Sequence, residues 1–398
     1  MEMIMDAKPI ARKYFTPGVV ILCAVALAGL ASLAVRFMFG LGSITHLDNQ
    51  HPWGIWIGID VAAGVALAAG GFTTAALSHI FHRHEYSVLT RPALLTAMLG
   101  YTFVALGVTV DVGRYYSIWH PLVMWNGTSV LFEVGMCVMI YTGVLYIEFL
   151  PIITKKYIGN VHLKGPLAGL NTPLDTFLRM LDKGLNRMMF VFIILGVVLS
   201  CLHQSSLGTL VIIAGSKIHP LWQTPVLPLM FLFSAISVGF PMVMLESLIA
   251  SRSFGLKPEM DVLSKLAVMI VPLLGVVLSI KLIDMVTRGT FVHLTRLTPE
   301  SVMFLAEMIL GVALPLVLLS FKSVRKSPCG LFLSSLLVIA GIVINRINVF
   351  LVGYHPPYAT TTYFPSFGEI LVTLGFISME VLLYRLIVKH FPFISQPQ

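Results

Sequence analysis

The stretch PGVVILCAVALAGLASLAVRFMF, residues 17 to 39, contains a single charged side chain, Arg36, in 23 residues. An α-helix rises about 1.5 Å per residue, so roughly 20 apolar residues cross the hydrocarbon core of a bilayer. Nine further apolar runs follow it, at residues 54–80, 93–110, 129–150, 188–204, 225–250, 263–286, 301–320, 331–352 and 368–388. The sequence therefore predicts an all-α membrane protein with ten transmembrane helices.

Composition and charge support a membrane protein and predict its orientation. Of 398 residues, 57% are apolar and 11% charged, whereas a soluble domain carries about 25% charge. The net charge of +8 comes mainly from Lys and Arg in the termini and in the loops on their side of the membrane. Positive charge marks the cytoplasmic side, so we predict that both termini are cytoplasmic. The basic charge thus sets topology and gives no indication of nucleic-acid binding.

We expect five segments along the chain. These are a cytoplasmic N-terminus at 1–16, helices one to four at 17–150, a cytoplasmic linker at 151–187, helices five to ten at 188–389, and a cytoplasmic tail at 390–398. In the linker, Thr172 can cap a helix that starts at Pro173. Its apolar face, formed by Leu174, Phe177, Leu178, Leu181 and Leu185, predicts a helix that lies on the membrane surface.

Five ionisable side chains stand near the outer ends of the predicted helices: Asp60, Asp111, Arg114, Glu133 and His203. A charge in the bilayer costs several kcal/mol, so such residues usually face the bundle interior and mark an ion, proton or substrate site. Two simpler interpretations stay open. Asp111 and Arg114 could form an ion pair that closes a helix end. His203, beside Gln204, could belong to a polar helix exit.

A quinone would suit this set of side chains. Its head group needs hydrogen-bond partners for two carbonyl oxygens, groups that exchange protons, and an apolar slot for its tail. Asp111, Glu133 and His203 could exchange the protons. An ion- or proton-coupled secondary transporter could use the same residues, although no clear internal repeat is visible in the sequence.

Carboxylates deeper in the helices suggest a proton path. Glu133 and Glu148 are about 22 Å apart along one helix at 1.5 Å per residue, so a relay needs intermediates. The candidates that we name for the path are Tyr141, Glu148, Glu246 and Glu380. Glu148 and Glu246 could instead be interfacial charges, Glu369 could belong to a capping box at 366–369, and Arg36 and Arg346 could snorkel outward.

The sequence predicts no haem and no iron–sulfur cluster in this chain. Cys23, Cys137, Cys201 and Cys329 are isolated, with no CxxC motif. Haem held by two histidines needs a pair inside the spans, but only His203 lies well within one. A b-type cytochrome is therefore the lesser alternative, and any metal centres must come from a partner.

Several motifs resemble one known family. They are HPWGIWIGIDVAAG at His51, TVDVGRYY at Thr109, SVLFE at Ser129, YIEFLP at Tyr146, LHQSSLGTL at Leu202 and HPLWQ at His219, with weaker agreement at IDMVTRG, SVMFLAE and FPSFGEI. These resemble the NrfD/PsrC family of integral membrane subunits that interact with quinones. The resemblance covers essentially the whole chain and is strongest to the HybB-type membrane subunits of hydrogenase-2-type nickel–iron hydrogenases.

The resemblance implies two four-helix bundles plus two peripheral helices, and a site for menaquinone or another quinone on the periplasmic side of a bacterial cytoplasmic membrane. It also implies partners: a ferredoxin-like subunit with 4Fe–4S clusters, and the large and small subunits of a nickel–iron hydrogenase. The family's polar positions fall on Asp60, Asp111, Arg114, Glu133, Glu148, His203 and Gln204. We add two outer aromatic residues, Trp53 and Tyr115, to the expected quinone site.

Overall fold

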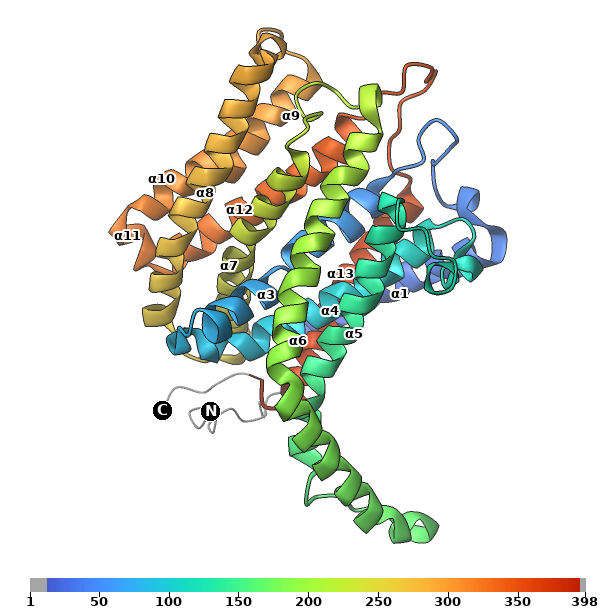
Figure 1. The fold of residues 1–398 in the computed structure, drawn as a ribbon, viewed down its shortest axis with the longest axis vertical. Helices are drawn as coiled ribbons and strands as arrows, with labels where there is room; N and C mark the ends of the chain where they lie inside the picture. Colours follow the sequence, from blue (N-terminus) through green and yellow to red (C-terminus); the bar gives the residue numbers. More distant parts are fainter. Residues whose placement is uncertain (1–12, 394–398) are drawn as a thin grey trace.

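The computed structural model describes residues 13–393. Within this range the chain has ten helices that are long and apolar enough to cross a membrane (Figure 1). The prediction of an all-α membrane protein with ten spans is confirmed.

Six of the first seven spans are single helices: α1 (Pro17–Phe39), α4 (Ser87–Asp111), α5 (Val130–Tyr157), α6 (Asn171–Ile213), α7 (Leu227–Phe254) and α8 (Met260–Arg288). The second span consists of η2 (Trp56–Ala63), α2 (Gly64–Leu67), α3 (Gly70–Ala75) and η3 (Ala76–Ile80). The eighth consists of α9 (Pro299–Met308), η10 (Ile309–Ala313) and α10 (Leu314–Ser320). The ninth and tenth are α12 (Pro328–Ile347) with η11 (Asn348–Val352), and α13 (Phe367–His390). Several connecting segments contain short helices, among them α11 (Lys322–Arg325) and η7 (Gly165–Leu170).

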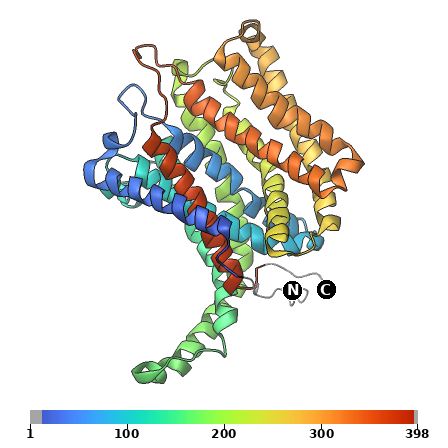
Figure 2. The same ribbon diagram turned by 180° about the vertical axis from the view of Figure 1, so that it is seen from behind.

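The spans form two bundles and a separate pair. In the first bundle the second span, α4, α5 and α6 pack side by side, and in the second α7, α8, the eighth span and α12 do so. The pair α1 and α13 packs against η2 and α4 (Figure 2). This is the expected arrangement of two four-helix bundles plus two peripheral helices.

Both ends of the described chain lie at the same end of the molecule. Tyr14 donates a hydrogen bond to the carbonyl of Leu382 near the end of α13 (3.0 Å), and Arg385 donates one to the carbonyl of Lys13 (3.4 Å). We call this end the terminal side and the opposite end the distal side. That the terminal side is cytoplasmic remains a prediction from the charge pattern.

The linker differs from its predicted boundaries. α5 continues through Pro151 to Tyr157, and α6 is one helix of 43 residues that runs past residue 187 without a break. At 1.5 Å per residue α6 is about 65 Å long, so it extends beyond the roughly 30 Å of a bilayer core on the terminal side (Figure 1). Good helix-forming residues surround Gly184, which explains the continuity. That the start of α6 contacts the membrane surface stays a prediction.

Candidate functional site

An acidic cluster lies where the distal ends of α1, η2, α4 and α13 meet. Asp60, in the π-helical segment η2, accepts a hydrogen bond from the Thr373 hydroxyl of α13 (2.6 Å). On its other side Asp60 packs against α4 at Gly107, where a Cβ would come within 3.3 Å of the Asp60 Cβ. π-helical turns are frequent at functional sites because they change the direction of side chains. Here the turn directs Asp60 between α4 and α13.

Asp60 and Thr373 line a cavity of about 360 Å³. Its walls are mostly apolar and come chiefly from η2, α2, α4 and α13, with Met242 of α7 and Val343 of α12 on the side of the second bundle. Glu380 also lines it, seven residues after Thr373 and hence about 10 Å further along α13. The cavity therefore connects a residue expected at the quinone with one expected on the proton path.

Arg36 holds the distal end of α4 beside this cluster. It is buried, at 2% exposure, and donates hydrogen bonds to the carbonyls of Val110 and Val112 (2.9 Å each). These carbonyls have no partner within the helix, so the guanidinium group acts as a C-terminal cap. Arg36 does not snorkel outward, and that interpretation was wrong.

Glu369 fixes the start of α13. Ser366 and Glu369 form the capping box suggested by the sequence. Glu369 also accepts hydrogen bonds from the Tyr363 hydroxyl (2.5 Å) and the His46 backbone N–H (3.1 Å). Burial and the hydrogen bond to Glu369 raise the pKa of Tyr363 above its ordinary value. Tyr363 thus stays a hydrogen-bond donor at neutral pH.

A second cluster lies inside the first bundle. His203 of α6 is fully buried, and its Nδ1 lies 3.2 Å from the hydroxyl of Tyr101 on α4. The Tyr101 ring packs edge-on against Tyr141 of α5, with centroids 4.4 Å apart. Among the described residues, neither His203 Nε2 nor the amide of the buried Gln204 has a hydrogen-bond partner. The cluster is a polar group in an otherwise closed apolar interior, and it is more than a simple helix exit.

Glu133 joins this second cluster at its edge. Its side chain is on the exposed side of the first turn of α5, where the positive end of the helix dipole favours a carboxylate. Glu133 accepts a hydrogen bond from Ser206 of α6 (2.6 Å), one turn beyond His203.

Three expected site residues lie elsewhere. Arg114 is exposed beyond the end of α4, and among the described residues it forms no ion pair with Asp111. Tyr115 packs against Phe37 near Arg36, with ring centroids 4.9 Å apart. Trp53 packs on Phe350 of η11, 5.6 Å between centroids. The structure therefore divides the expected set between two clusters and the surface.

The expected proton path is likewise divided. Glu148 and Tyr141 line a small gap in the first bundle at Gly196, where a Cβ would approach Glu148 Oε1 to 3.1 Å. Glu246 lies instead on α7, near Thr96 and Tyr384 and close to Glu380. Among the described residues, both Glu246 carboxylate oxygens are buried and lack a hydrogen-bond partner. Neither Glu148 nor Glu246 is simply a charge at the membrane surface.

The polar partners Thr373, Tyr101 and Tyr363 were missed from the sequence. Hydroxyl side chains in a helix commonly bond their own backbone, as Thr102 and Thr142 do here. Nothing in the spacing distinguished Thr373 and Tyr101, which bond across helices, or Tyr363, which bonds Glu369 from the loop before α13.

The comparisons with known proteins fit this fold. A family model described as "Polysulphide reductase, NrfD" matches residues 43–356. The chain belongs to the NrfD family. An Escherichia coli protein, "Probable Ni/Fe-hydrogenase 2 b-type cytochrome subunit", is 34% identical over 98% of this chain and 95% of its own length. The family resemblance stated from the motifs is confirmed.

Other NrfD relatives serve different complexes. The "Menaquinone reductase, integral membrane subunit" of Nitratidesulfovibrio vulgaris is 24% identical over 90% of this chain and 86% of its own length. A selenate reductase subunit of Mesobacillus selenatarsenatis is 22% identical over 96% of this chain and 94% of its own length. The chain is thus related to membrane subunits of hydrogenases and of quinone-linked reductases.

One relative is named a b-type cytochrome subunit, so the positions of the histidines in this chain are relevant. His203 contacts Tyr101, while His79 lies in η3 at the terminal end of the second span. Among residues 13–393, no three His, Cys, Asp or Glu side chains are grouped so that they could hold a metal ion. The absence of haem from this chain remains a prediction.

Proposed function

We propose that this chain is the quinone-interacting membrane subunit of a respiratory oxidoreductase, a periplasmic nickel–iron uptake hydrogenase in a bacterial cytoplasmic membrane. It passes electrons from a partner subunit with 4Fe–4S clusters to menaquinone. The observation that carries the proposal is the 360 Å³ cavity that is lined by the hydrogen-bonded pair Asp60 and Thr373.

The cavity has the properties that a quinone head group requires. Small-molecule sites usually have volumes of about 300–1,000 Å³, with mainly apolar walls and a few placed polar groups. Ala63, Gly64 and Gly100 leave room between η2, α2 and α4 for a planar ring. Protonated Asp60 can donate a hydrogen bond to one quinone carbonyl, while the Thr373 hydroxyl holds its other carboxyl oxygen. In this proposal Asp111, next to Asp60, is the adjacent acid.

Quinone reduction takes up two electrons and two protons, and two rows of side chains could supply the protons. The first row consists of Glu380, Glu246 and Tyr384. It ends at a gap on the terminal side, and Glu259 also lines this gap. Burial raises the pKa of Glu259, so this residue can hold a proton closer to neutral pH. We assign the proton supply of the quinone site to this row.

The second row runs inside the first bundle through Glu148, Tyr141, Tyr101 and His203. Gly100 faces the quinone cavity while its neighbour Tyr101 faces His203, so α4 separates the two sites by its own width. We assign His203, Gln204 and Glu133 to proton exchange on the distal side. Proton uptake from the terminal side would carry charge across most of the membrane.

The iron–sulfur partner would dock on the distal face. This face carries exposed aromatic side chains in the segment between α4 and α5: Tyr116 (65% exposed), Trp119 (52%) and Trp125 (76%). Tyr and Trp are enriched at protein–protein interfaces. A partner at this position would bring its clusters near Asp111, and we infer that the distal side is periplasmic.

The test replaces Asp60 in the complete complex purified from membranes. We expect Asp60→Asn to lower hydrogen-dependent menaquinone reduction about tenfold or more, because an amide cannot exchange a proton with the quinone. Hydrogen oxidation with a soluble dye, which bypasses this subunit, should be unchanged. Asp261→Asn, at an exposed aspartate of α8, is the matched control. Normal menaquinone reduction by Asp60→Asn would rule out the assigned site.

A further inference from the structure

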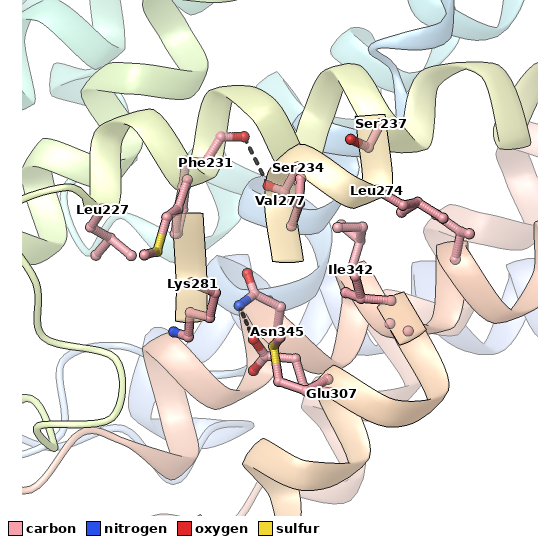
Figure 3. A pocket seen from close by; sticks show the side chains of 16 residues that line it. Leu227, Phe231, Ser234, Ser237, Leu274, Val277, Lys281, Glu307, Ile342 and Asn345 are labelled. Atoms are coloured by element: carbon pink, nitrogen blue, oxygen red, sulfur yellow. Dashed lines mark hydrogen bonds between the residues drawn. The ribbon is translucent and has the colours of Figure 1, made fainter. Parts of the chain in front are cut away.

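The second bundle encloses a group of buried charges that the proposed quinone chemistry does not use. Lys281 of α8 and Glu307 of α9 are each 5% exposed, and Arg346 of α12 is fully buried. Lys281 and Glu307 line a cavity of about 50 Å³ together with Asn345 and Ser234. Figure 3 shows Lys281, Glu307 and Asn345 entering this space from three different helices. Such charges inside a membrane are costly and usually functional.

Glu307 is held by three neutral N–H donors. Asn345 Nδ2 donates to one carboxylate oxygen (2.8 Å), and Trp222 Nε1 and Asn348 Nδ2 donate to the other (2.9 Å each). These groups replace the water that would solvate the carboxylate.

Arg346 is paired with Glu307 through an amide. Its Nη1 donates to Asn345 Oδ1 (2.6 Å), and Asn345 in turn donates to Glu307. The guanidinium also lies over the Phe231 ring at 3.5 Å and donates to the Ser234 hydroxyl (3.0 Å). Arg346 keeps its charge under all conditions in proteins. It does not snorkel outward, because it points into the bundle and Glu307 compensates its charge.

Lys281 has no carboxylate of its own. Its Nζ donates to the carbonyl of Leu221 (3.1 Å) and lies 4.9 Å from the centre of the Phe304 ring. Asp284, one turn along α8, is engaged by Arg288 and by the Thr224 hydroxyl. Among the described residues, no carboxylate is within ion-pair distance of Lys281. With the partly exposed Arg288, which pairs with Asp284, the group contains three cations (Lys281, Arg288 and Arg346) and two carboxylates (Asp284 and Glu307), and Lys281 is the cation that only a carbonyl and an aromatic ring contact.

We propose that Lys281 is a proton-exchange site in the second bundle. An N–H bond of its ammonium group breaks, the proton passes to water in the adjoining cavity, and the neutral amine later takes a proton back. No electrons move in this step. A cavity of about 50 Å³ accommodates one or two water molecules, each of which occupies about 30 Å³ in the liquid. When Lys281 loses its proton, its positive charge disappears. The charge returns when the neutral amine takes a proton back.

The segment that contains Leu221 lies on the distal side of Lys281 and connects this site to the distal surface. Leu221, whose carbonyl holds Lys281, belongs to the same short segment as His219. The Leu221 N–H donates to His219 Nδ1 (3.3 Å). The His219 ring neighbours those of His293 and His355, with centroids 5.1 and 6.4 Å away. Partial burial and the adjacent histidines lower the pKa of His219, so a neutral imidazole is available to accept a proton. The proton therefore exchanges with the distal side.

α12 links this site to the quinone cavity. Val343 of α12 lines the quinone cavity. Asn345 and Arg346, on the same turn of α12, belong to the group around Glu307. A shift of α12 that accompanies quinone binding would therefore move the partners of Glu307. The inference rests on the proposed function, because quinone turnover drives the exchange.

The experiment measures proton translocation and menaquinone reduction in the same liposomes, with the complete complex and hydrogen as the electron donor. We expect Lys281→Met, which cannot be charged, and Lys281→Arg, which cannot lose its charge, each to lower the protons translocated per quinone about twofold or more. Their menaquinone reduction rates with an uncoupler present should match the wild type. Lys265→Met, at an exposed lysine of the same helix, is the control.

Each of the other possible outcomes contradicts either the role of Lys281 or the proposed function. Full proton translocation by Lys281→Arg would mean that only a fixed positive charge is required. Full translocation by Lys281→Met would mean that the charge is not used, and Lys281→Gln replaces this variant if the methionine protein does not assemble. A wild type that reduces menaquinone without translocating protons would also overturn the inference. Failure of the wild type to reduce menaquinone would instead reject the proposed function.

Discussion

At the scale of single residues, three buried charges near the proposed quinone cavity have specific polar partners. Asp60 bonds Thr373, Glu369 bonds Tyr363, and Arg36 bonds two backbone carbonyls. A buried polar group that loses its partner destabilises a protein by about 1–3 kcal/mol. These pairs therefore stabilise the fold as well as placing the site.

Arg36 gives the clearest test of this stabilisation. We expect Arg36→Met to lower the free energy of unfolding in detergent by roughly 2 kcal/mol, because the last carbonyls of α4 lose their donors. Arg252→Met, at an exposed arginine near the end of α7, should change stability little. Equal stability of the two variants would contradict the capping role of Arg36.

The ionisable residues could be predicted from the sequence, but their partners could not. Asp60 and His203 stand out because they interrupt apolar runs. Thr373 is 313 residues from Asp60 and Tyr101 is 102 from His203, so only the packing of the helices reveals each contact. The common depth of the ionisable residues suggested a single site. The structure separates them because residues at one depth can face different helices.

At the scale of elements, the packing of α1 against α13 sets the position of one cavity wall. A Cβ at Gly29 would lie 2.7 Å from the Cα of Gly375, so the two backbones touch. The ten spans were predictable because hydropathy reports them directly. The end of the linker at residue 187 was not, because a helix that leaves the membrane changes its polarity without any break in its backbone.

This contact can be opened by one substitution. We expect Gly29→Leu to displace α13 and with it Thr373 and Glu380, and so to lower menaquinone reduction about fivefold or more. Dye-linked hydrogen oxidation should persist. Gly18→Leu is the control on the same helix, because nothing lies within 4 Å of a Cβ at Gly18. Equal rates in the two variants would show that the α1–α13 contact does not shape the site.

At the scale of the whole molecule, the proposed quinone cavity lies where the first bundle, the α1–α13 pair and the second bundle meet. The row through Glu380 and Glu246 begins at this cavity, whereas the row through Glu148 and His203 lies beyond α4, so their contributions can be separated. We expect Glu246→Gln to slow menaquinone reduction about fivefold, because this row serves the cavity directly. Glu148→Gln should have a smaller effect on the rate. The reverse order would assign proton supply to the row inside the first bundle.

Photolabelling of the complete complex identifies the helices that contact the quinone. A light-activated azido-menaquinone is bound to the complete complex, and the labelled peptides are identified by mass spectrometry, with and without excess menaquinone. The account predicts that menaquinone-protected label appears in η2 and in α13 between Ile370 and Glu380. Protected label confined to α5 and α6 around Glu133 and His203, or to the second bundle, would contradict it.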